Sequence, residues 1–332
     1  MRYFLVAIVC LSLFTANACS SKDSPKPEMK RCQEELNTIP EVAASLKSRN
    51  KQPEEAGDAL AGMEIALTIN RMVRSTPDPN RDRDDWCYIE NTYENFDKLL
   101  KALRDNGIPP TVDFLEGESL DLALQEEWLR SGNLIGDLTF RGVSPKKGSA
   151  QDFIDTLSKI EQELSPLWGK FERKHKYFRY PALKLGVDSE RPREIRAYLK
   201  QNSFIEVPAT IDSRDDYFSQ PYCAALNRDH KVCANYISAT FKSMMLDRTV
   251  RARAAAQKIV GRDIKQILMI QANQLTCDFL DELLRWYKAL GVRFISLEDA
   301  LSDPFYAAED VTNNASQIIW ETKRGQGVMK GE

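Results

Sequence analysis

Short apolar segments alternate with amphipathic helical segments along most of this 332-residue chain, and this alternation constrains the fold more than any other feature. The first apolar segment, 64–70, reads Glu-Ile-Ala-Leu-Thr-Ile-Asn and has the length and β-branched content of a buried strand. The helical segments, such as 91–106, carry apolar side chains three and four positions apart. Strands that alternate with helices predict a parallel sheet joined by right-handed crossovers.

Seven strands, with helices between them, are predicted in this way. The predicted strands are 64–70, 111–115, 134–140, 177–181, 204–212, 266–272 and 292–297, and the predicted helices are 91–106, 120–130, 150–164, 191–201, 234–259 and 277–289. About seven such units over ~240 residues fit an α/β fold, a distorted parallel (β/α) barrel of about seven strands, better than an open sheet. In such barrels function lies where strands end and loops begin.

The remaining segments define the predicted organisation of the chain. Residues 213–233 are predicted to form a long loop inside the barrel domain. Four regions follow: a signal peptide at 1–18, a tether and N-terminal helical segment at 19–60, the barrel at 61–301 and a C-terminal tail at 302–332 that lacks clear periodicity. The net charge is −3, so no overall field attracts nucleic acid, which is not an expected partner.

The N-terminus carries the pattern of an export signal. Arg2 is followed by an apolar run at 4–14, which is too short for a permanent membrane anchor. Residues 16–18, Ala-Asn-Ala, fit a signal-peptidase site, whereas Cys19 with the Ser-Ser-Lys that follows resembles a lipidation site. We favour a lipid anchor on Cys19. Both routes predict an exported chain, either periplasmic, secreted or membrane-anchored, with membrane contact only through that lipid.

Cysteine usage agrees with export. Cys223 and Cys233 lie ten positions apart in a polar, turn-rich stretch and are predicted to form a disulfide. His230 lies between them and leaves a zinc site open as the alternative. Four ligands at the spacing of a zinc knuckle are not present, so the disulfide is the preferred interpretation.

The stretch 131–142, Ser-Gly-Asn-Leu-Ile-Gly-Asp-Leu-Thr-Phe-Arg-Gly, resembles the second motif of the NodB-like polysaccharide deacetylases, carbohydrate esterase family 4. That motif is Gly-(His or Asn)-x-(Ile or Leu)-Gly-Asn-His-Thr-(Tyr or Phe)-Ser-His, and its two final histidines bind a catalytic divalent metal. Here those positions hold Leu138 and Gly142, which offer a metal no side-chain lone pair. Arg179, in Phe-Arg-Tyr-Pro, matches the family's Arg-x-Pro motif, whose arginine orients the catalytic base.

The other catalytic positions of the family are replaced as well. Asn70 and Arg71 stand where the family's Thr-Phe-Asp-Asp-Gly motif places its general base and a metal-binding aspartate. Gln271 stands where the general-acid histidine is expected. An amide does not take up a proton at ordinary pH, and a guanidinium repels a metal. The resemblance thus implies a barrel without base, acid or metal ligands, so no cofactor is expected although the family uses a divalent metal.

Candidate binding residues remain at the predicted strand ends. Arg71 could replace the positive charge of the metal and bind a carboxylate or acetyl oxygen, or it could pair internally with Asp212. Aromatic residues in the polar loops are predicted to be exposed, where their faces could stack on sugar rings. The candidate cleft residues are Arg71, Trp86, Arg179, Asp212, Asp215 and Tyr217.

These patterns predict an exported polysaccharide deacetylase-like protein that has lost catalysis and binds a cell-wall polysaccharide such as peptidoglycan, or a protein of the envelope. One alternative is an active carbohydrate N-deacetylase with relocated metal ligands, since two acidic loops, one with Asp78, Asp82, Asp84 and Asp85 and one with Asp212, Asp215 and Asp216, could hold Ca²⁺ or Mg²⁺. Another is a structural envelope lipoprotein whose working surface is the arginine-bearing helix 242–262 or the segment 29–48.

Overall fold

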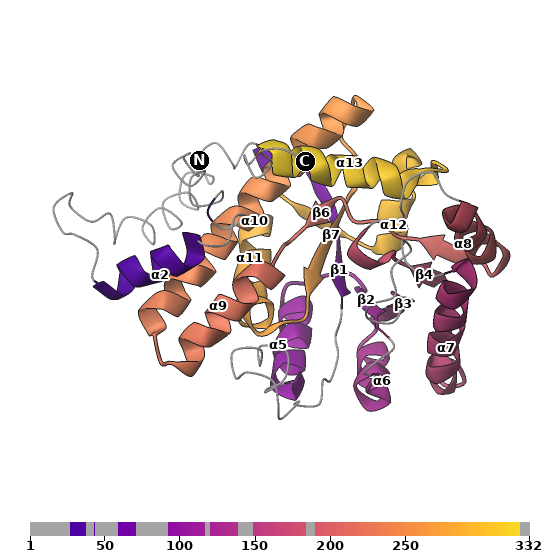
Figure 1. Ribbon diagram of the computed structural model, residues 1–332, viewed down its shortest axis with the longest axis horizontal. Coiled ribbons are helices and arrows are strands. Elements are labelled where there is room, and N and C mark those ends of the chain that lie inside the picture. The colour runs from indigo at the N-terminus through magenta and orange to yellow at the C-terminus, as the bar shows by residue number, and fades with distance from the viewer. Residues whose placement is uncertain are drawn as a thin grey trace, which may run out of the picture.

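The computed structural model describes residues 27–37, 43, 59–70, 92–116, 120–138, 149–183 and 190–325. Their strands form one sheet in the order β5-β4-β3-β2-β1-β7-β6, with β8 paired to β1, and every pairing is parallel. Helices surround this sheet (Figure 1). The predicted α/β fold with a parallel sheet is thereby confirmed.

The elements follow one another in strand–helix order. The strands are β1 (Glu64–Asn70), β2 (Val112–Leu115), β3 (Leu134–Asp137), β4 (Lys176–Phe178), β5 (Phe204–Glu206), β6 (Ile211–Asp212), β7 (Gln266–Gln271) and β8 (Arg293–Ile295). The helices are α2 (Pro27–Asn37), α5 (Thr92–Asp105), α6 (Leu122–Arg130), α7 (Ala150–Trp168), α8 (Glu190–Gln201), α9 (Asp216–Asn227), α10 (Lys231–Val260), α11 (Gln274–Ala289), α12 (Leu297–Leu301) and α13 (Val311–Gly325), with short 3₁₀ turns η2 (Pro181–Leu183) and η3 (Pro304–Ala307).

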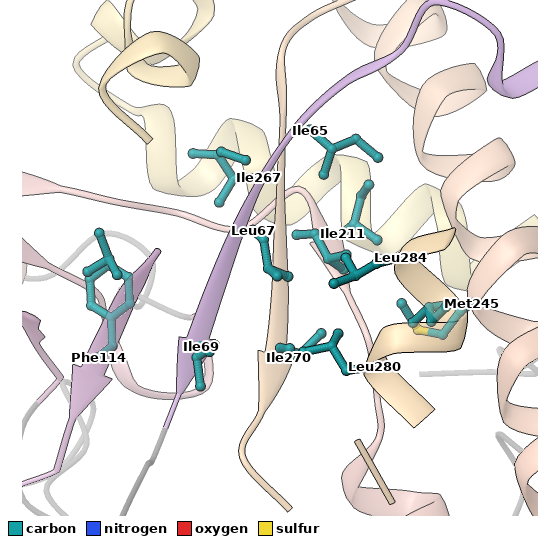
Figure 2. Close-up of a cluster of buried hydrophobic side chains, with 14 of the residues drawn as sticks. Ile65, Leu67, Ile69, Phe114, Ile211, Met245, Ile267, Ile270, Leu280 and Leu284 are labelled. Atoms are coloured by element: carbon teal, nitrogen blue, oxygen red, sulfur yellow. The ribbon is translucent and has the colours of Figure 1, made fainter. Parts of the chain in front are cut away.

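Strand β1 is the centre of the sheet. It pairs with β7 along its whole length, and its other edge is shared by β8 in the first half and β2 in the second. Figure 2 shows Leu67 and Ile69 of β1 in one buried cluster with Leu280 and Leu284 of α11 and Met245 of α10. Burying each such side chain stabilises the folded protein by about 1.5–3 kcal/mol. Strand β1 is buried on both faces, and this is why its sequence is an almost unbroken apolar run.

The chain between β5 and β6 links the two ends of the sheet. The amide of Val207 still donates to Phe178 O of β4 (2.7 Å), whereas the amide of Thr210 donates to Ile267 O of β7 (3.0 Å). The segment predicted as one strand, 204–212, therefore leaves one edge of the sheet and joins the other. Pro208 lies in this link and has no N–H to donate, so the predicted strand divides into the short strands β5 and β6.

Two predicted irregular segments contain helices. The predicted loop 213–233 includes α9, whose Pro221 lies inside the helix and hid it in the sequence. The predicted tail includes α13, which buries Val311, Ala315 and Ile318 at helical spacing. Both helices pack against α10, so they belong to the same hydrophobic core as the barrel.

The predicted disulfide between Cys223 and Cys233 is wrong. Cys233 is bonded to Cys32 of α2, with the two Cα atoms 5.7 Å apart. The physical reason is that α2 packs along α10, which brings together two cysteines 201 positions apart in sequence. Cys223 lies on α9 instead of in a loop and is disulfide-bonded as well, while Cys277 is a buried free thiol. With Cys233 bonded, the zinc alternative around His230 loses a ligand.

Helix α10 uses its arginines internally, although the sequence left this arginine-bearing helix open as a working surface. Arg248 is 1% exposed, Arg251 pairs with Asp247, and Arg253 forms a two-pronged pair with Asp263. These guanidinium groups therefore hold the fold together. Across the described ranges, no helix is sufficiently long and apolar to cross a membrane.

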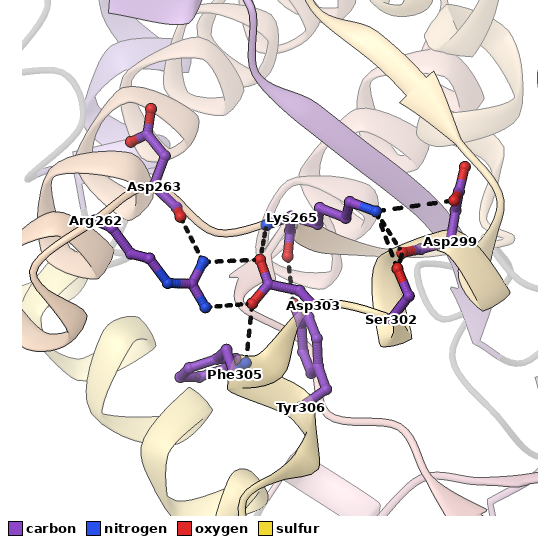
Figure 3. A network of polar contacts seen from close by, with 8 residues as sticks. All are labelled: Arg262, Asp263, Lys265, Asp299, Ser302, Asp303, Phe305 and Tyr306. Carbon is purple, nitrogen blue, oxygen red and sulfur yellow. Dashed lines mark hydrogen bonds and ion pairs between the residues drawn. The ribbon is translucent and has the colours of Figure 1, made fainter.

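A polar network fastens the C-terminal segment to the barrel where β7 begins (Figure 3). Asp303 accepts two hydrogen bonds from Arg262, at 2.6 and 3.0 Å, and one each from the amides of Lys265 (3.1 Å) and Phe305 (2.9 Å). Burial alone would raise the pKa of the Asp303 carboxyl, but these donors together hold its pKa below the ordinary value.

Replacing Asp303 with alanine is expected to lower the free energy of unfolding by about 2–3 kcal/mol, because one buried and one partly buried backbone amide lose their acceptor and Arg262 loses its ion pair. Asp303→Asn keeps an oxygen acceptor and should lose about 1 kcal/mol. Because the folded-state pKa is depressed, the wild-type contribution is present above about pH 4 and is lost as the pH falls below it. Urea denaturation of the three proteins at about pH 7 and pH 3 measures both effects; equal losses for both variants at pH 7 would contradict the assigned role of the backbone amides.

Candidate functional site

Arg179 occupies the interior of the barrel just after β4 and is 1% exposed. It donates from Nη1 to Asn70 Oδ1 (2.8 Å), from Nη2 to Thr68 Oγ1 (2.9 Å) and from Nε to Val207 O (3.0 Å). Its guanidinium carbon lies 4.0 Å from the ring centre of Phe114. One side chain thus joins β1, β2 and the link between β5 and β6.

Gly136 of β3 makes room for this arrangement. A Cβ atom at this position would come within 2.7 Å of the Phe114 ring, which is closer than real contacts allow. The glycine of the resembled motif therefore has a structural reason here: it lets Phe114 lie flat beneath the guanidinium of Arg179.

The hydrogen-bond partners of Arg179 within the described residues are all neutral. Burial therefore lowers the pKa of the guanidinium to about 9, and the more distant Tyr306 and Asp212 oppose this only partly. The barrel interior holds a cation through an amide, a hydroxyl and a carbonyl oxygen. A carboxylate at position 70 would have neutralised it.

Asn70 is engaged on both ends of its amide. Its Oδ1 accepts from Arg179, and its Nδ2 donates to Met269 Sδ at 3.2 Å. The side chain is only 9% exposed at the end of β1. Because a neutral amide neither takes up a proton nor has a free acceptor here, the position where the resemblance expects a general base is occupied by a structural hydrogen bond.

The other positions of the resembled motifs do not fit a divalent metal. Leu138, just after β3, is 2% exposed and its side chain belongs to the hydrophobic core. Gln271 ends β7, and its Oε1 is buried and finds no hydrogen-bond partner among the described residues. That part of the chain contains no group of three or more His, Cys, Asp or Glu side chains placed to hold a metal ion.

Asp215 is fully buried and ties two elements together at the carboxyl end of the sheet. Its Oδ2 accepts from the amide of Gln271 (2.7 Å) and from Thr276 Oγ1 (2.8 Å), so it links the end of β7 to the first turn of α11. Its Oδ1 is unpartnered within the described ranges. Burial raises the pKa of this carboxyl to about 7 despite its hydrogen bonds.

Asp212 and Tyr217 face a different residue, Arg214. Asp212 Oδ1 accepts from the amide of Arg214 at 3.2 Å, and Oδ2 lies 3.5 Å from its Nε. The same guanidinium lies 4.7 Å from the ring centre of Tyr217, which is half-buried instead of exposed as predicted. Asp212 and Asp215 therefore serve separate contacts and do not form a cation site with other described residues. The second acidic loop, 78–85, lies outside the described residues.

Sequence reasoning missed a buried ionic cluster beside β3. Asp137 Oδ2 accepts from Arg173 Nη2 at 2.6 Å, and Arg173 Nη1 also pairs with Glu161 of α7 at 2.5 Å. Burial raises the pKa of Asp137 to about 7, and the nearby Glu161 offsets part of the effect of Arg173. Asp137 is thus committed to Arg173. This pairing depends on the packing of α7 beside β3, which no local sequence pattern shows.

The remaining predicted site residues fall in segments that the structure does not describe. They are the metal-replacing Arg71, the aromatic Trp86, the degenerate ligand position Gly142 and the lipidation site Cys19.

Replacing Asp215 with asparagine is expected to flatten the pH dependence of stability. Because burial raises the folded-state pKa above that of the unfolded chain, the wild-type contribution is complete below about pH 4 and is lost as the pH rises through about 7. Wild type should therefore lose about 1–3 kcal/mol over this range relative to Asp215→Asn, whose amide needs no proton. Urea denaturation at several pH values measures the difference, with Asp229→Asn on the surface as the matched control. Parallel curves for wild type and Asp215→Asn would contradict the burial argument.

Comparison with known proteins finds similar solved structures but assigns no family and no activity. No family model matches the sequence, and no curated protein matches it. A family 4 carbohydrate esterase pseudoenzyme from Bacillus anthracis is 15% identical, with a TM-score of 0.47 over 73% of this chain and 66% of its own. The chitin deacetylase of Colletotrichum lindemuthianum is 15% identical (TM-score 0.47; 73% and 90% covered), and a peptidoglycan N-acetylglucosamine deacetylase is 17% identical (TM-score 0.46; 71% and 87% covered). The chain thus spans about two thirds of the length of the B. anthracis protein.

Proposed function

We propose that this chain is an exported, non-catalytic protein with a polysaccharide deacetylase-like barrel, and that it binds cell-wall polysaccharide. The observation that carries the proposal is the hydrogen bond from Arg179 to Asn70 Oδ1, which places a neutral amide where the resembled enzymes have their general base. Amide hydrolysis requires a polarised carbonyl, an activated water and proton transfer. Asn70, Leu138 and Gln271 supply none of these.

The alternative of an active enzyme with relocated ligands receives no support from the acidic loop. Asp212 is directed to Arg214, whereas Asp215 is directed to Thr276 and the amide of Gln271. Two carboxylates with separate structural partners do not converge on a metal or on a water molecule. The alternative that uses the arginines of α10 as a docking surface is also weakened, because Arg251 and Arg253 are paired within the chain.

The ligand would contact the loops at the strand ends and not the interior. Asn70, Leu138 and Arg179 are each less than a tenth exposed, so they cannot line an open groove. Tyr217 is half-buried at the carboxyl end of the sheet, beside the guanidinium of Arg214. An aromatic face next to a cation offers stacking and hydrogen bonding to a sugar ring.

Export is supported by the bond between Cys32 and Cys233, because such bonds persist in oxidising compartments. Together with the N-terminal pattern at 1–19, it favours a periplasmic, secreted or membrane-anchored protein. Incorporation of labelled palmitate that disappears in Cys19→Ala would establish the lipid anchor, and a cleaved, unlabelled mature chain would establish soluble export instead.

Co-sedimentation with purified peptidoglycan tests the binding role. Wild type is expected to sediment with the polymer and to release no acetate from it. Tyr217→Ala should weaken sedimentation about 5–10-fold, in keeping with the loss of one stacking contact. Trp320→Ala removes an aromatic side chain that is 43% exposed on α13 and should have no effect. A failure of the wild type to sediment would reject polysaccharide binding and favour an envelope protein as the partner.

A further inference from the structure

We propose that the turn between α9 and α10 is a membrane-contact surface that rests on the lipid bilayer to which the N-terminus is anchored. The inference rests on the proposed export and lipid anchoring of the chain. Among the described residues, the exposed large hydrophobic side chains are Leu122, Leu226, Val232 and Trp320, and Leu226 and Val232 flank this one turn at 41% exposure each.

The turn holds these two side chains on a rigid support. Leu226 lies in the last turn of α9 and Val232 in the first turn of α10. The amide of Asp229 donates to Leu226 O at 2.9 Å, and the amide of His230 donates to Ala225 O at 2.8 Å. The connection between the two helices is therefore a short hairpin whose backbone is held by its own hydrogen bonds, and this fixes the Cα positions of Leu226 and Val232 on either side of it.

Helix α2 is fixed at the same end of the molecule as the turn between α9 and α10. Cys233, which follows Val232 directly, is bonded to Cys32, and α2 lies along α10 beside this hairpin (Figure 1). The predicted lipidated residue, Cys19, precedes Pro27 at the start of α2 by eight positions. Eight residues span at most about 28 Å when fully extended, so an anchor at Cys19 keeps the hairpin tip close to the bilayer.

The chemistry of the tip fits a lipid surface better than bulk water. His230 and Lys231 lie between the two apolar side chains, and Asp229, the acid of the turn, lies 3.8 Å from Lys231. Basic side chains are attracted to anionic headgroups, while leucine and valine enter the acyl boundary. Two partly exposed apolar side chains are too few to hold a free protein on a membrane. A tether raises the effective concentration enough for such a weak contact to form and to orient the barrel.

Hydrogen–deuterium exchange on tethered protein tests the contact. Residues 20–332 with an N-terminal hexahistidine tag are held on vesicles of phosphatidylglycerol, phosphatidylcholine and a nickel-chelating lipid, and the same protein is held on nickel resin without lipid. The amides of 226–233 are expected to exchange about 5-fold more slowly on vesicles. The double variant Leu226→Ser/Val232→Ser should lose this difference, whereas Leu122→Ser, which removes an exposed leucine on α6, should retain it.

Equal exchange of 226–233 on vesicles and on resin would overturn the proposal, as would slowing that survives in the double variant. Because the nickel tether replaces the lipid, this outcome does not depend on modification of Cys19. A chain that shows slowed exchange but takes up no palmitate supports the contact surface and rejects the natural anchor. A chain that takes up palmitate but shows no slowing supports the anchor and rejects the contact surface.

Discussion

Replacing Arg179 with alanine is expected to lower the free energy of unfolding by about 3–5 kcal/mol, the largest effect of any single substitution considered. The variant loses hydrogen bonds to Asn70, Thr68 and Val207 and leaves two of these acceptors buried without a donor. It also leaves a cavity beneath the Phe114 ring. Urea denaturation followed by far-UV circular dichroism at about pH 7 measures the loss.

Arg179→Met is the matched control, because it fills much of the same space without a charge. Since burying an arginine without a carboxylate partner is itself costly, methionine should lose only about 1–2 kcal/mol. A loss below about 1 kcal/mol for Arg179→Ala would show that the guanidinium does not hold the barrel together. Equal losses for alanine and methionine would assign the effect to the hydrogen bonds and not to the cavity.

Replacing Cys233 with serine is expected to lower the free energy of unfolding by about 2–4 kcal/mol and to release α2 from α10. The bond closes a chain segment between positions 201 apart, so its removal gives the unfolded chain much additional freedom. Urea denaturation measures the loss. Trypsin cleavage after Lys30 and Arg31 in otherwise folded protein measures the release of α2.

Cys32→Ser is the matched variant, because it removes the other half of the same bond. It should give the same loss as Cys233→Ser, and the double variant should add nothing further, since both changes break one covalent link. If the losses of the two single variants add in the double variant, each cysteine stabilises the protein separately and the two do not form one bond.

Most of the fold could be predicted from the sequence because the strands and helices alternate with clear periodicity. Strand β1 has the predicted limits, Glu64–Asn70, since an unbroken apolar run buried on both faces allows little ambiguity. Helix α9 could not be predicted because Pro221 lies inside it, and proline usually ends a helix. The division of 204–212 could not be predicted because β5 and β6 pair with different strands, which depends on tertiary packing. Helix α13 was missed although its apolar spacing is helical.

The candidate site was only partly predictable. Motif resemblance identified Asn70 and Arg179, which the structure brings to within 2.8 Å of each other. The roles of Thr68 and Val207 as the other partners of Arg179 depend on side chains that meet across the barrel, and no local pattern records them. The same reason explains the error over Cys233, because spacing in sequence favoured Cys223 whereas the packing of α2 on α10 selected Cys32.

Acetate release from N-acetylated chito-oligosaccharides and peptidoglycan, with Zn²⁺, Co²⁺ or Ca²⁺ supplied, tests the proposed loss of catalysis most directly. The barrel interior predicts no release above that of the buffer, because Asn70 is a neutral amide bonded to Arg179 and Leu138 is a buried hydrocarbon. Metal-dependent acetate release by the wild type that is abolished in Asp212→Asn or Asp215→Asn would contradict the account and establish an active enzyme with relocated ligands.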